Sequence, residues 1–232
     1  MLLMKTRFNQ PGQPEVQFTV EEEGLPRESI DHVVGMFEEI VRRGGSIAPG
    51  QHIQLGWSLV KAIDSQTGCL SLVEPDGVSI PLQFKDGLTD ALRQMLLQLW
   101  HADSFQIPRE SLELPSIQDA AIACARLSAG DDLVMSRSEP AGKHDSGWFI
   151  GCGDRAHDHH DPRELVRMSL YHAFTRQPKI APWAGFPVGT TVRLAPGEHP
   201  QVFIGEHECT LVPESFLDQA LHAPGRGHSH AS

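Results

Sequence analysis

The sequence predicts an α+β protein of two small domains, each with antiparallel strands packed against one or two helices. Segments with helical spacing of apolar residues are interspersed with short segments of alternating polar and apolar residues, as in half-buried strands. With 232 residues, 40% of them hydrophobic, the chain can bury a core in each domain. Prolines and polar residues between 103 and 118 indicate the boundary. We therefore expect domains at 1–113 and 114–212, followed by a flexible tail at 213–232.

The first half is expected to contain two helices and several strands. Between Ile30 and Val41 apolar residues recur at helical spacing, and Gly44-Gly45 would end that helix. Residues 88–99 show the same spacing. The expected elements, in order, are a strand over 16–20, a helix after Pro26, a strand over 51–63, its hairpin partner over 69–73, a strand over 80–84 and a helix over about 88–100.

The second half combines short apolar strands with one helix. Pro162 is predicted to open this helix with Glu164 in its first turn, and its apolar face would run from Leu165 to Phe174. Strands are expected at 121–125, 133–135, 148–150, 191–194 and 202–204, with a helical turn as the alternative at 121–125. Prolines at 178, 182 and 187 predict an extended segment before the late strands, and Pro187-Val188-Gly189-Thr190 predicts a turn.

Charge and cysteine usage narrow the classes of function. The formal net charge is −11 at pH 7, which disfavours binding to phosphate backbones and favours a partner with a basic surface. The cysteines at 69, 124, 152 and 209 form no Cys-x-x-Cys pair, so we expect reduced thiols rather than a disulfide framework. The sequence shows neither a signal-peptide pattern nor an apolar run long enough to span a membrane. We therefore predict a cytoplasmic protein without nucleic-acid or membrane partners.

The densest group of special residues lies in the middle of the second half. Asp145-Ser146-Gly147 is typical of a turn, because Asp and Ser side chains bond nearby backbone and Gly allows positive φ. Trp148-Phe149-Ile150 predicts a short buried strand, which Gly151 and Gly153 would end. The polar run His157-Asp158-His159-His160-Asp161 follows directly. We expect the function to centre on this segment.

Several motifs of the second half, over roughly residues 120–195, resemble the immunity protein 33 domain family. The resemblance implies a small α+β protein, encoded beside a polymorphic toxin in bacteria, that neutralises the cognate toxin. The first half resembles no family that we can name. The motifs that carry the resemblance are Cys124, Met135-Ser136-Arg137, Glu139-Pro140, Asp145-Ser146-Gly147-Trp148, Gly151 to Asp154, Leu165, Leu170, Ile180 and Pro187-Val188-Gly189-Thr190.

An immunity protein acts by occluding or distorting its target, so it needs a complementary surface rather than a catalytic set. Carboxylates around the polar loop are suited to a basic cleft on a toxin, and tryptophan is enriched at binding hot spots. Core packing is the alternative role for the tryptophan, because it lies in an apolar run. The predicted toxin-binding residues are Asp145, Trp148, Asp154, Asp158 and Asp161. No catalytic residue and no cofactor are expected.

The same loop allows a second hypothesis, that of a metal-binding protein or a metal-dependent hydrolase. Zinc requires three or four nitrogen, sulfur or oxygen donors that converge on one point. The spacing is unfavourable, because the adjacent side chains of His159 and His160 should point apart, and a solvated polar loop is the simpler reading. Convergence of Cys152 with two loop histidines would favour a metal site. Its candidate ligands are Cys152, His157, His159 and His160, with Asp158 and Asp161 as further donors.

A third hypothesis takes Ser146 as a nucleophile. His144 or His172 would act as its base, and Asp145 or Asp154 would orient that base. Such triads are defined by geometry, and the sequence lacks a Gly-x-Ser-x-Gly motif. We therefore expect Ser146 to form a turn and not to act in catalysis.

Overall fold

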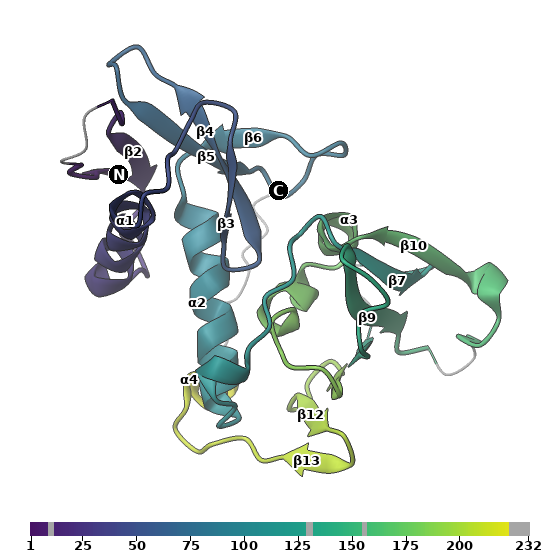
Figure 1. Cartoon of the computed structure of the whole chain (residues 1–232). Coiled ribbons are helices and arrows are strands. Elements are labelled where there is room, and N and C mark those ends of the chain that lie inside the picture. Colours follow the sequence, from purple (N-terminus) through teal and green to yellow (C-terminus); the bar gives the residue numbers. More distant parts are fainter. Residues whose placement is uncertain (9–11, 129–131, 155–156, 223–232) are drawn as a thin grey trace, which may run out of the picture.

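A computed structural model of the chain describes residues 1–8, 12–128, 132–154 and 157–222. Within these residues the chain forms two β-sheets with helices packed around them, which confirms the predicted α+β class (Figure 1). Most neighbouring strands are antiparallel, as predicted, but each sheet also contains one parallel pair. None of the described helices is both long and apolar enough to cross a membrane.

The first sheet lies within residues 2–86. Its described strands are β1 (Leu2–Lys5), β2 (Val16–Val20), β3 (His52–Leu55), β4 (Ser58–Asp64), β5 (Leu70–Pro75) and β6 (Phe84–Asp86). They follow the order β1-β2-β5-β4-β3, and β6 pairs with β5. The strand predicted over 51–63 is divided into β3 and β4, because Gly56 adopts a φ of +61° and forms a tight turn with Trp57. The strand predicted over 80–84 lies instead at β6.

Both predicted helices of the first half are present, as α1 (Arg27–Arg42) and α2 (Thr89–Ser104). In α1 the predicted apolar stripe is buried, with Ile30, Val33 and Phe37 at 1% exposure or less. These side chains pack with β2, β4 and β5 in what we call the first core, to which α2 contributes Leu92 and Leu96. The helical spacing of apolar residues therefore identified the two faces that cover this sheet.

The second sheet contains the strands of the second half. The described strands are β7 (Ala120–Cys124), β8 (Leu133–Arg137), β9 (Asp145–Cys152), β10 (Leu165–Ser169), β11 (Thr190–Leu194), β12 (Gln201–Ile204) and β13 (His207–Cys209). They follow the order β10-β7-β9-β8-β11-β12-β13. Short helical segments connect them: η1 (Arg109–Ser111), η2 (Pro162–Glu164), α3 (Leu170–Arg176) and η3 (Pro178–Trp183). The predicted extended segment near Pro178 is thus a 3-10 helix.

The helix predicted from Pro162 to Phe174 is wrong over its first half. The three-residue η2 starts at this proline and ends at Glu164. The next residues form β10, which pairs with β7 from Leu165 opposite Cys124 to Ser169 opposite Ala120. The helix α3 starts one residue later, where the Ser169 hydroxyl accepts a hydrogen bond from the His172 N–H at 3.1 Å. Pairing with an otherwise open strand edge therefore outweighs the helical spacing of the apolar residues.

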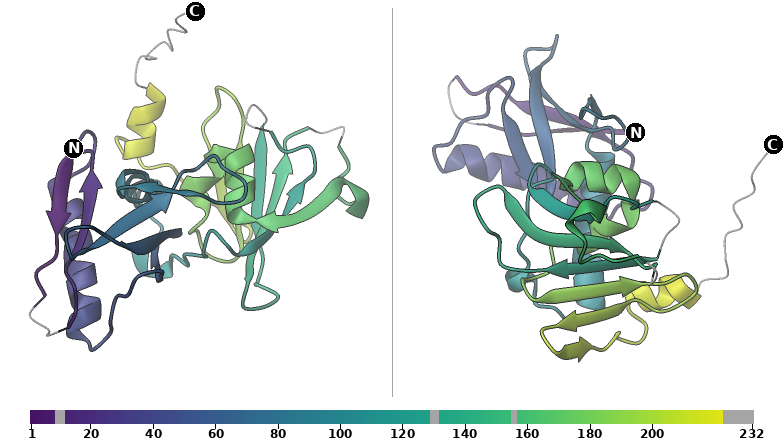
Figure 2. Two further views of the ribbon diagram at one scale, coloured as in Figure 1. Left: turned by 90° about the horizontal axis from the view of Figure 1, so that it is seen from above. Right: turned by 90° about the vertical axis from the view of Figure 1, so that its right-hand side faces the viewer.

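The two halves share buried side chains, and α2 stands between them (Figure 1). The second core consists of most of the buried hydrophobic residues of the second half together with Trp57, Ala102, Phe105 and Ile107. Trp57 is 1% exposed, and its ring meets the ring of Phe174 edge-on at 5.5 Å. Figure 2 shows the purple-to-blue first half beside the teal-to-green second half. The second core includes residues from both sides of position 113, so the core does not mark a domain boundary there. The division at residue 113 remains a prediction.

The segment predicted as a flexible tail begins with a helix, α4 (Phe216–His222). The Phe216 ring lies 4.8 Å from the Trp100 ring of α2, and the Leu217 N–H donates a hydrogen bond to the Ser104 hydroxyl at 3.2 Å. Leu217 is 8% exposed. The predicted tail is thus corrected over 216–222, because α2 offers this helix an apolar surface. Residues 223–232 lie outside the described part of the chain.

Arg137, at the end of β8, fixes the beginning of β9. Its guanidinium donates hydrogen bonds to the carbonyls of Ser146 at 3.1 Å, Glu113 at 2.9 Å and Phe186 at 2.5 Å. The residue is 5% exposed, and burial lowers the pKa of its side chain. One buried cation therefore joins three separate chain segments at the turn before Trp148.

Candidate functional site

The parallel pairing of β7 with β9 brings two cysteines together. Ala123 lies opposite Ile150, so the two parallel strands finish at the same end of the sheet. The last residue of β7 is Cys124, and the last residue of β9 is Cys152. Both thiols are free and buried, and their sulfur atoms lie 3.6 Å apart. The sequence separation of these residues concealed this proximity, because only the topology of the sheet creates it.

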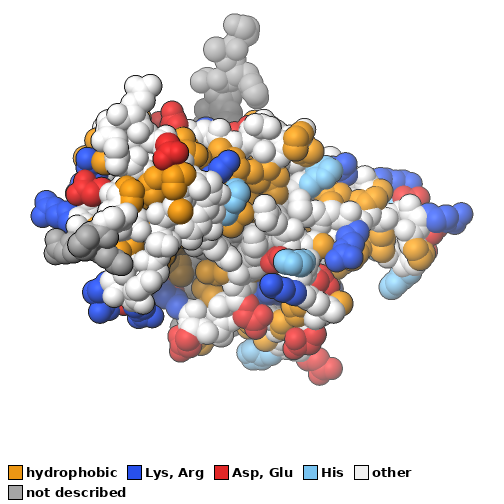
Figure 3. All heavy atoms as spheres, turned by 45° about the horizontal axis from the view of Figure 1, so that its top comes forward, with side chains coloured by type: hydrophobic (Ala, Val, Ile, Leu, Met, Phe, Trp, Pro, Cys, Tyr) orange, Lys and Arg blue, Asp and Glu red, His pale blue; other side chains and the backbone are white. Residues whose placement is uncertain are grey.

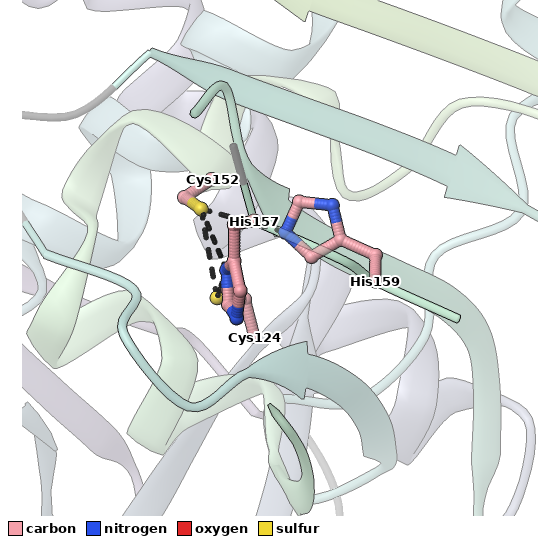
Figure 4. A group of neighbouring side chains, drawn as sticks. All are labelled: Cys124, Cys152, His157 and His159. Carbon is pink, nitrogen blue, oxygen red and sulfur yellow. Dashed lines mark hydrogen bonds between the residues drawn. The ribbon is translucent and has the colours of Figure 1, made fainter. Parts of the chain in front are cut away.

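The loop after β9 returns two histidines to the same point. His157 is 8% exposed, and its Nδ1 lies 3.2 Å from the sulfur atoms of both Cys124 and Cys152. His159 is half-buried, with its Nε2 at 3.4 Å from the sulfur of Cys152. Among the described residues, these four side chains place one donor atom each within 4.8 Å of all the others. Figure 4 shows the four side chains gathered around one point.

A carboxylate fixes the orientation of the His157 ring. Glu164, in η2, places its Oε2 at 2.9 Å from the His157 Nε2, on the side of the ring away from the thiols. Arg126 lies 3.4 Å from the same carboxylate oxygen. The hydrogen bond with His157, followed by the charge of Arg126, holds the pKa of Glu164 below its usual value. With Nε2 engaged in this way, Nδ1 is directed at the two sulfur atoms.

Both sulfur atoms also receive backbone hydrogen bonds. The Arg126 N–H donates to the Cys124 sulfur at 3.3 Å, and the Asp154 backbone donates to Cys152. In each case the donor lies two residues after the cysteine. Such N–H groups stabilise a negatively charged sulfur. At Cys152 burial is the larger influence and raises the pKa of the thiol, while burial and the neighbouring His157 lower the pKa of His159.

Two glycines make room for this arrangement. A Cβ on Gly151 would lie 3.3 Å from the His159 ring and 3.0 Å from the Phe149 ring, which meets His159 edge-on. A Cβ on Gly153 would lie 2.1 Å from the Cβ of Asp132. The Gly-Cys-Gly sequence therefore lets the loop close over this end of the sheet.

The predicted metal ligands thus divide into two groups. Cys152 converges with His157 and His159, which is the outcome that the sequence analysis associated with a metal site. His160 is exposed and lies outside the cluster found among the described residues, as expected for a neighbour of His159. Cys124 also belongs to this cluster, although the sequence analysis did not include it among the candidate ligands. The one signal for it is that it ends an apolar strand, as Cys152 does.

Three of the predicted toxin-binding carboxylates form local hydrogen bonds. Asp145 accepts from the N–H groups of Ala141 at 2.9 Å and Gly147 at 3.1 Å, which shapes the turn before β9. Asp158 is exposed and accepts from the His160 N–H at 2.8 Å. Asp161 caps η2 and pairs with Arg163 at 2.7 Å. The remaining carboxylate, Asp154, is exposed beside Gly153.

Trp148 and Ser146 lie in the interior. Trp148 is 1% exposed, and its indole N–H donates to the Ala184 carbonyl at 2.9 Å. Its position in the core removes it from the set of surface contact candidates. Ser146 is also 1% exposed, and its hydroxyl donates to the Ala120 carbonyl at 2.7 Å while accepting from the Trp148 N–H. The serine therefore closes a turn against β7 and is not accessible as a nucleophile.

The segment that contains the cluster was compared with known protein families. Residues 106–204 match the family model of the Imm33-like domain. The second half of the chain carries an Imm33-like domain. This confirms the resemblance to the immunity protein 33 family. The match begins after the end of α2 and closes with β12, so the Imm33-like domain includes the whole cluster. Searches of curated proteins and of solved structures found no match to the chain.

Proposed function

We propose that this protein is an immunity protein that binds and neutralises a cognate bacterial toxin, without catalysing a reaction. The match of residues 106–204 to the Imm33-like domain carries this proposal. We place the protein in the cytoplasm, because its cysteines are free thiols and form no disulfide framework. A toxin with a basic surface is the partner that suits a formal net charge of −11.

The proposed contact surface is the loop that follows β9. Asp154 and Asp158 are exposed there, and Asp161 is partly exposed. On the face drawn in Figure 3, acidic, basic and histidine side chains of the described residues are interspersed. We therefore assign the contact with a basic cleft to this local group of carboxylates and not to the net charge of the whole chain. Asp145 stands at the other end of β9 and is a candidate contact at a second position.

Two observations support a non-catalytic role. Ser146, the proposed nucleophile, is buried with its hydroxyl engaged by the backbone. The side-chain cluster of the described residues supplies four donor atoms, whereas a catalytic zinc site keeps one position open for water or substrate. Both features favour a binding protein over a hydrolase.

Co-expression with the polypeptide encoded next to this protein tests the proposal. We expect that polypeptide to stop growth when it is produced alone, and we expect growth to recover when both are produced. The two chains should also purify together. A neighbouring product that is harmless, or one that stays toxic and unbound in the presence of this protein, would refute the proposal.

Paired charge reversals test the proposed contact surface. Asp154→Lys with Asp158→Lys should weaken toxin binding about tenfold at low salt, since complementary charges mainly accelerate encounter. Glu206→Lys with Glu208→Lys is the matched control, because both residues are exposed at the opposite edge of the sheet, next to and within β13. The net charge changes equally in the two variants. Equal weakening by both would contradict the assignment of the loop.

A further inference from the structure

We propose that Cys124, Cys152, His157 and His159 bind one zinc ion in a closed tetrahedral site. The ion would fasten the loop of residues 153–164 to the end of the second sheet. This inference rests on the side-chain cluster alone and does not depend on the proposed immunity function.

The spacing of the donor atoms fits zinc. In a tetrahedral site with Zn–S of about 2.3 Å and Zn–N of about 2.0–2.1 Å, the sulfur–sulfur edge is about 3.8 Å and each sulfur–nitrogen edge is about 3.6 Å. The corresponding distances here are 3.6 Å between the sulfur atoms, 3.2 Å from each sulfur to His157 and 3.4 Å from Cys152 to His159. A disulfide would instead need its sulfur atoms about 2.05 Å apart.

The groups around the cluster are those that a bound zinc ion requires. A histidine ligand usually directs its second nitrogen to a carboxylate, which fixes the ring and strengthens its basicity. Glu164 has this position relative to His157, at 2.9 Å. Thiolate ligands are stabilised by N–H donors, and each cysteine sulfur receives one from the residue two positions later. A cluster formed only by chance packing would not require both arrangements.

The donor set identifies the metal class and its role. Two sulfur and two imidazole donors in a tetrahedral arrangement are typical of zinc, whereas calcium and magnesium select oxygen donors. Cys124 is fully buried and Cys152 is 5% exposed, so the ion would be shielded by protein on the side of the sheet. With the four described donors engaged, the coordination shell is complete. The site is therefore structural.

The proposed ion has a clear mechanical effect on the loop. Between the end of β9 and the start of β10, the one element assigned among the described residues is the three-residue η2. Two histidines from this stretch would be tied to cysteines on the central strands β7 and β9. Binding at these points fixes the backbone next to Asp154, Asp158 and Asp161. The exposed carboxylates would then be presented in one conformation.

Metal analysis of the purified, reduced full-length chain tests the proposal. His222, His228 and His230 are replaced by Gln in the background, so that the histidines near the C-terminus contribute no metal. We expect one zinc ion per chain. Cys124→Ser, Cys152→Ser and His157→Gln should each abolish it. Glu164→Gln, which leaves all four ligands in place, should weaken zinc binding about tenfold, the effect of losing a partner of a metal-bound histidine.

Matched variants separate this site from general binding by histidines and thiols. His160→Gln is the control for His159→Gln, because the two residues are adjacent in one loop and His160 is exposed outside the cluster. Cys69→Ser is the control for the two cysteine variants, since Cys69 is also buried but belongs to the first half. Both controls should retain a full complement of zinc.

Cobalt substitution gives a readout that loss of folding cannot imitate. Cobalt bound by two thiolates and two imidazoles should show the ligand-field bands of a tetrahedral ion and a thiolate-to-cobalt charge-transfer band. His159→Cys should keep the metal and strengthen the charge-transfer band in proportion to the third thiolate. The unchanged sheet content of each variant is checked by circular dichroism.

Three results would overturn the proposal. The first is a reduced wild-type chain that contains no zinc and gives no tetrahedral cobalt spectrum. The second is a disulfide between Cys124 and Cys152 in the chain as isolated, detected by intact mass before and after reduction. The third is an equal loss of zinc from His159→Gln and His160→Gln, which would indicate non-specific binding by the loop histidines.

Discussion

Replacement of Arg137 by Met should be among the most destabilising single changes in the second half. The Met side chain matches the aliphatic part of Arg, so the substitution removes the guanidinium and its hydrogen bonds to the carbonyls of Ser146, Glu113 and Phe186. The carbonyls of Ser146 and Phe186 lose a donor in a buried region, whereas the carbonyl of Glu113 lies nearer to the solvent. The turn before β9 would lose its connection to the segments at 113 and 186.

The size of the effect follows from these contacts. A hydrogen bond to a charged group contributes about 1.5–3 kcal/mol net, and a buried carbonyl that loses its donor, as at Ser146 and Phe186, costs about 1–3 kcal/mol. Burial of the guanidinium is itself unfavourable, as its lowered pKa indicates, so part of this cost is recovered when Met replaces it. We therefore expect the free energy of unfolding to fall by about 4 kcal/mol.

Urea unfolding at constant zinc concentration measures this change. With a urea dependence of about 2 kcal/mol per molar, the midpoint should fall by about 2 M. Arg137→Lys should lie between Met and the wild type, because an ammonium group keeps the charge but cannot reach three separate carbonyls in the same geometry. Arg167→Met is the matched control, since Arg167 is exposed on β10 of the same sheet. A midpoint for Arg137→Met equal to that of the control would refute the role of Arg137 as a connector.

Further predictions concern pH and backbone conformation. Burial raises the pKa of Glu74 from 4.5 to about 7, so the folded chain keeps a proton that the unfolded chain has lost, and stability falls as the pH rises through this window. Glu74→Gln should remove this loss of about 3 kcal/mol. Burial lowers the pKa of His101 from 6.5 to about 4. The stability that the buried neutral ring contributes is therefore present above pH 6.5 and is lost as the pH falls towards 4. His101→Phe should remove that loss. Because the two titrations oppose each other, urea midpoints of the wild type between pH 4 and 7 should vary less than those of either variant. Gly147 has a φ of +73°, and a Cβ there would lie 2.1 Å from the Ser138 carbonyl oxygen. Gly147→Ala should therefore lower the free energy of unfolding by at least about 2 kcal/mol. Gly142→Ala is the control in the same urea titrations and should be nearly neutral, because a Cβ there would meet nothing within 4 Å.

The sequence was most informative where one local pattern had one structural solution. In α1 the apolar stripe from Ile30 to Val41, bounded by Pro26 and Gly44, left little choice but an amphipathic helix against a sheet. The turn at Pro187 to Thr190 was predicted for a similar reason, because Gly189 adopts the positive φ of +86° that other residues avoid. Local chemistry determines structure at such positions.

Prediction failed where distant segments decide the conformation. Residues 165–169 have apolar positions that fit a helix, but they pair with β7, and nothing in their own sequence reveals that this strand has an open edge. The tight turn at Gly56 was hidden for a related reason. Alternation of polar and apolar residues continues on both sides of it, although Trp57 leaves the first sheet and enters the second core.

At the candidate site, too, the residues within one segment were predicted and the contacts between distant segments were not. The sequence identified Cys152 and the loop histidines, and the expectation that His159 and His160 diverge is confirmed by their positions. Cys124 could not be paired with Cys152 by spacing, because their proximity depends on the parallel alignment of two strands that are far apart in the chain. Glu164, which orients His157, was interpreted as a favourable charge in the first turn of an α-helix, where the chain instead forms the short 3-10 helix η2.

The position of α2 has a consequence for how this protein can change over generations. Its side chains complete both cores, and it ends at Ser104, just before the segment that matches the Imm33-like domain begins. Recombination that joined a new copy of that segment to this first half would have to match the shapes of Trp57 and Phe105 as well. A substitution in an exposed surface loop carries no such requirement, because it leaves the shared core between the two halves unchanged.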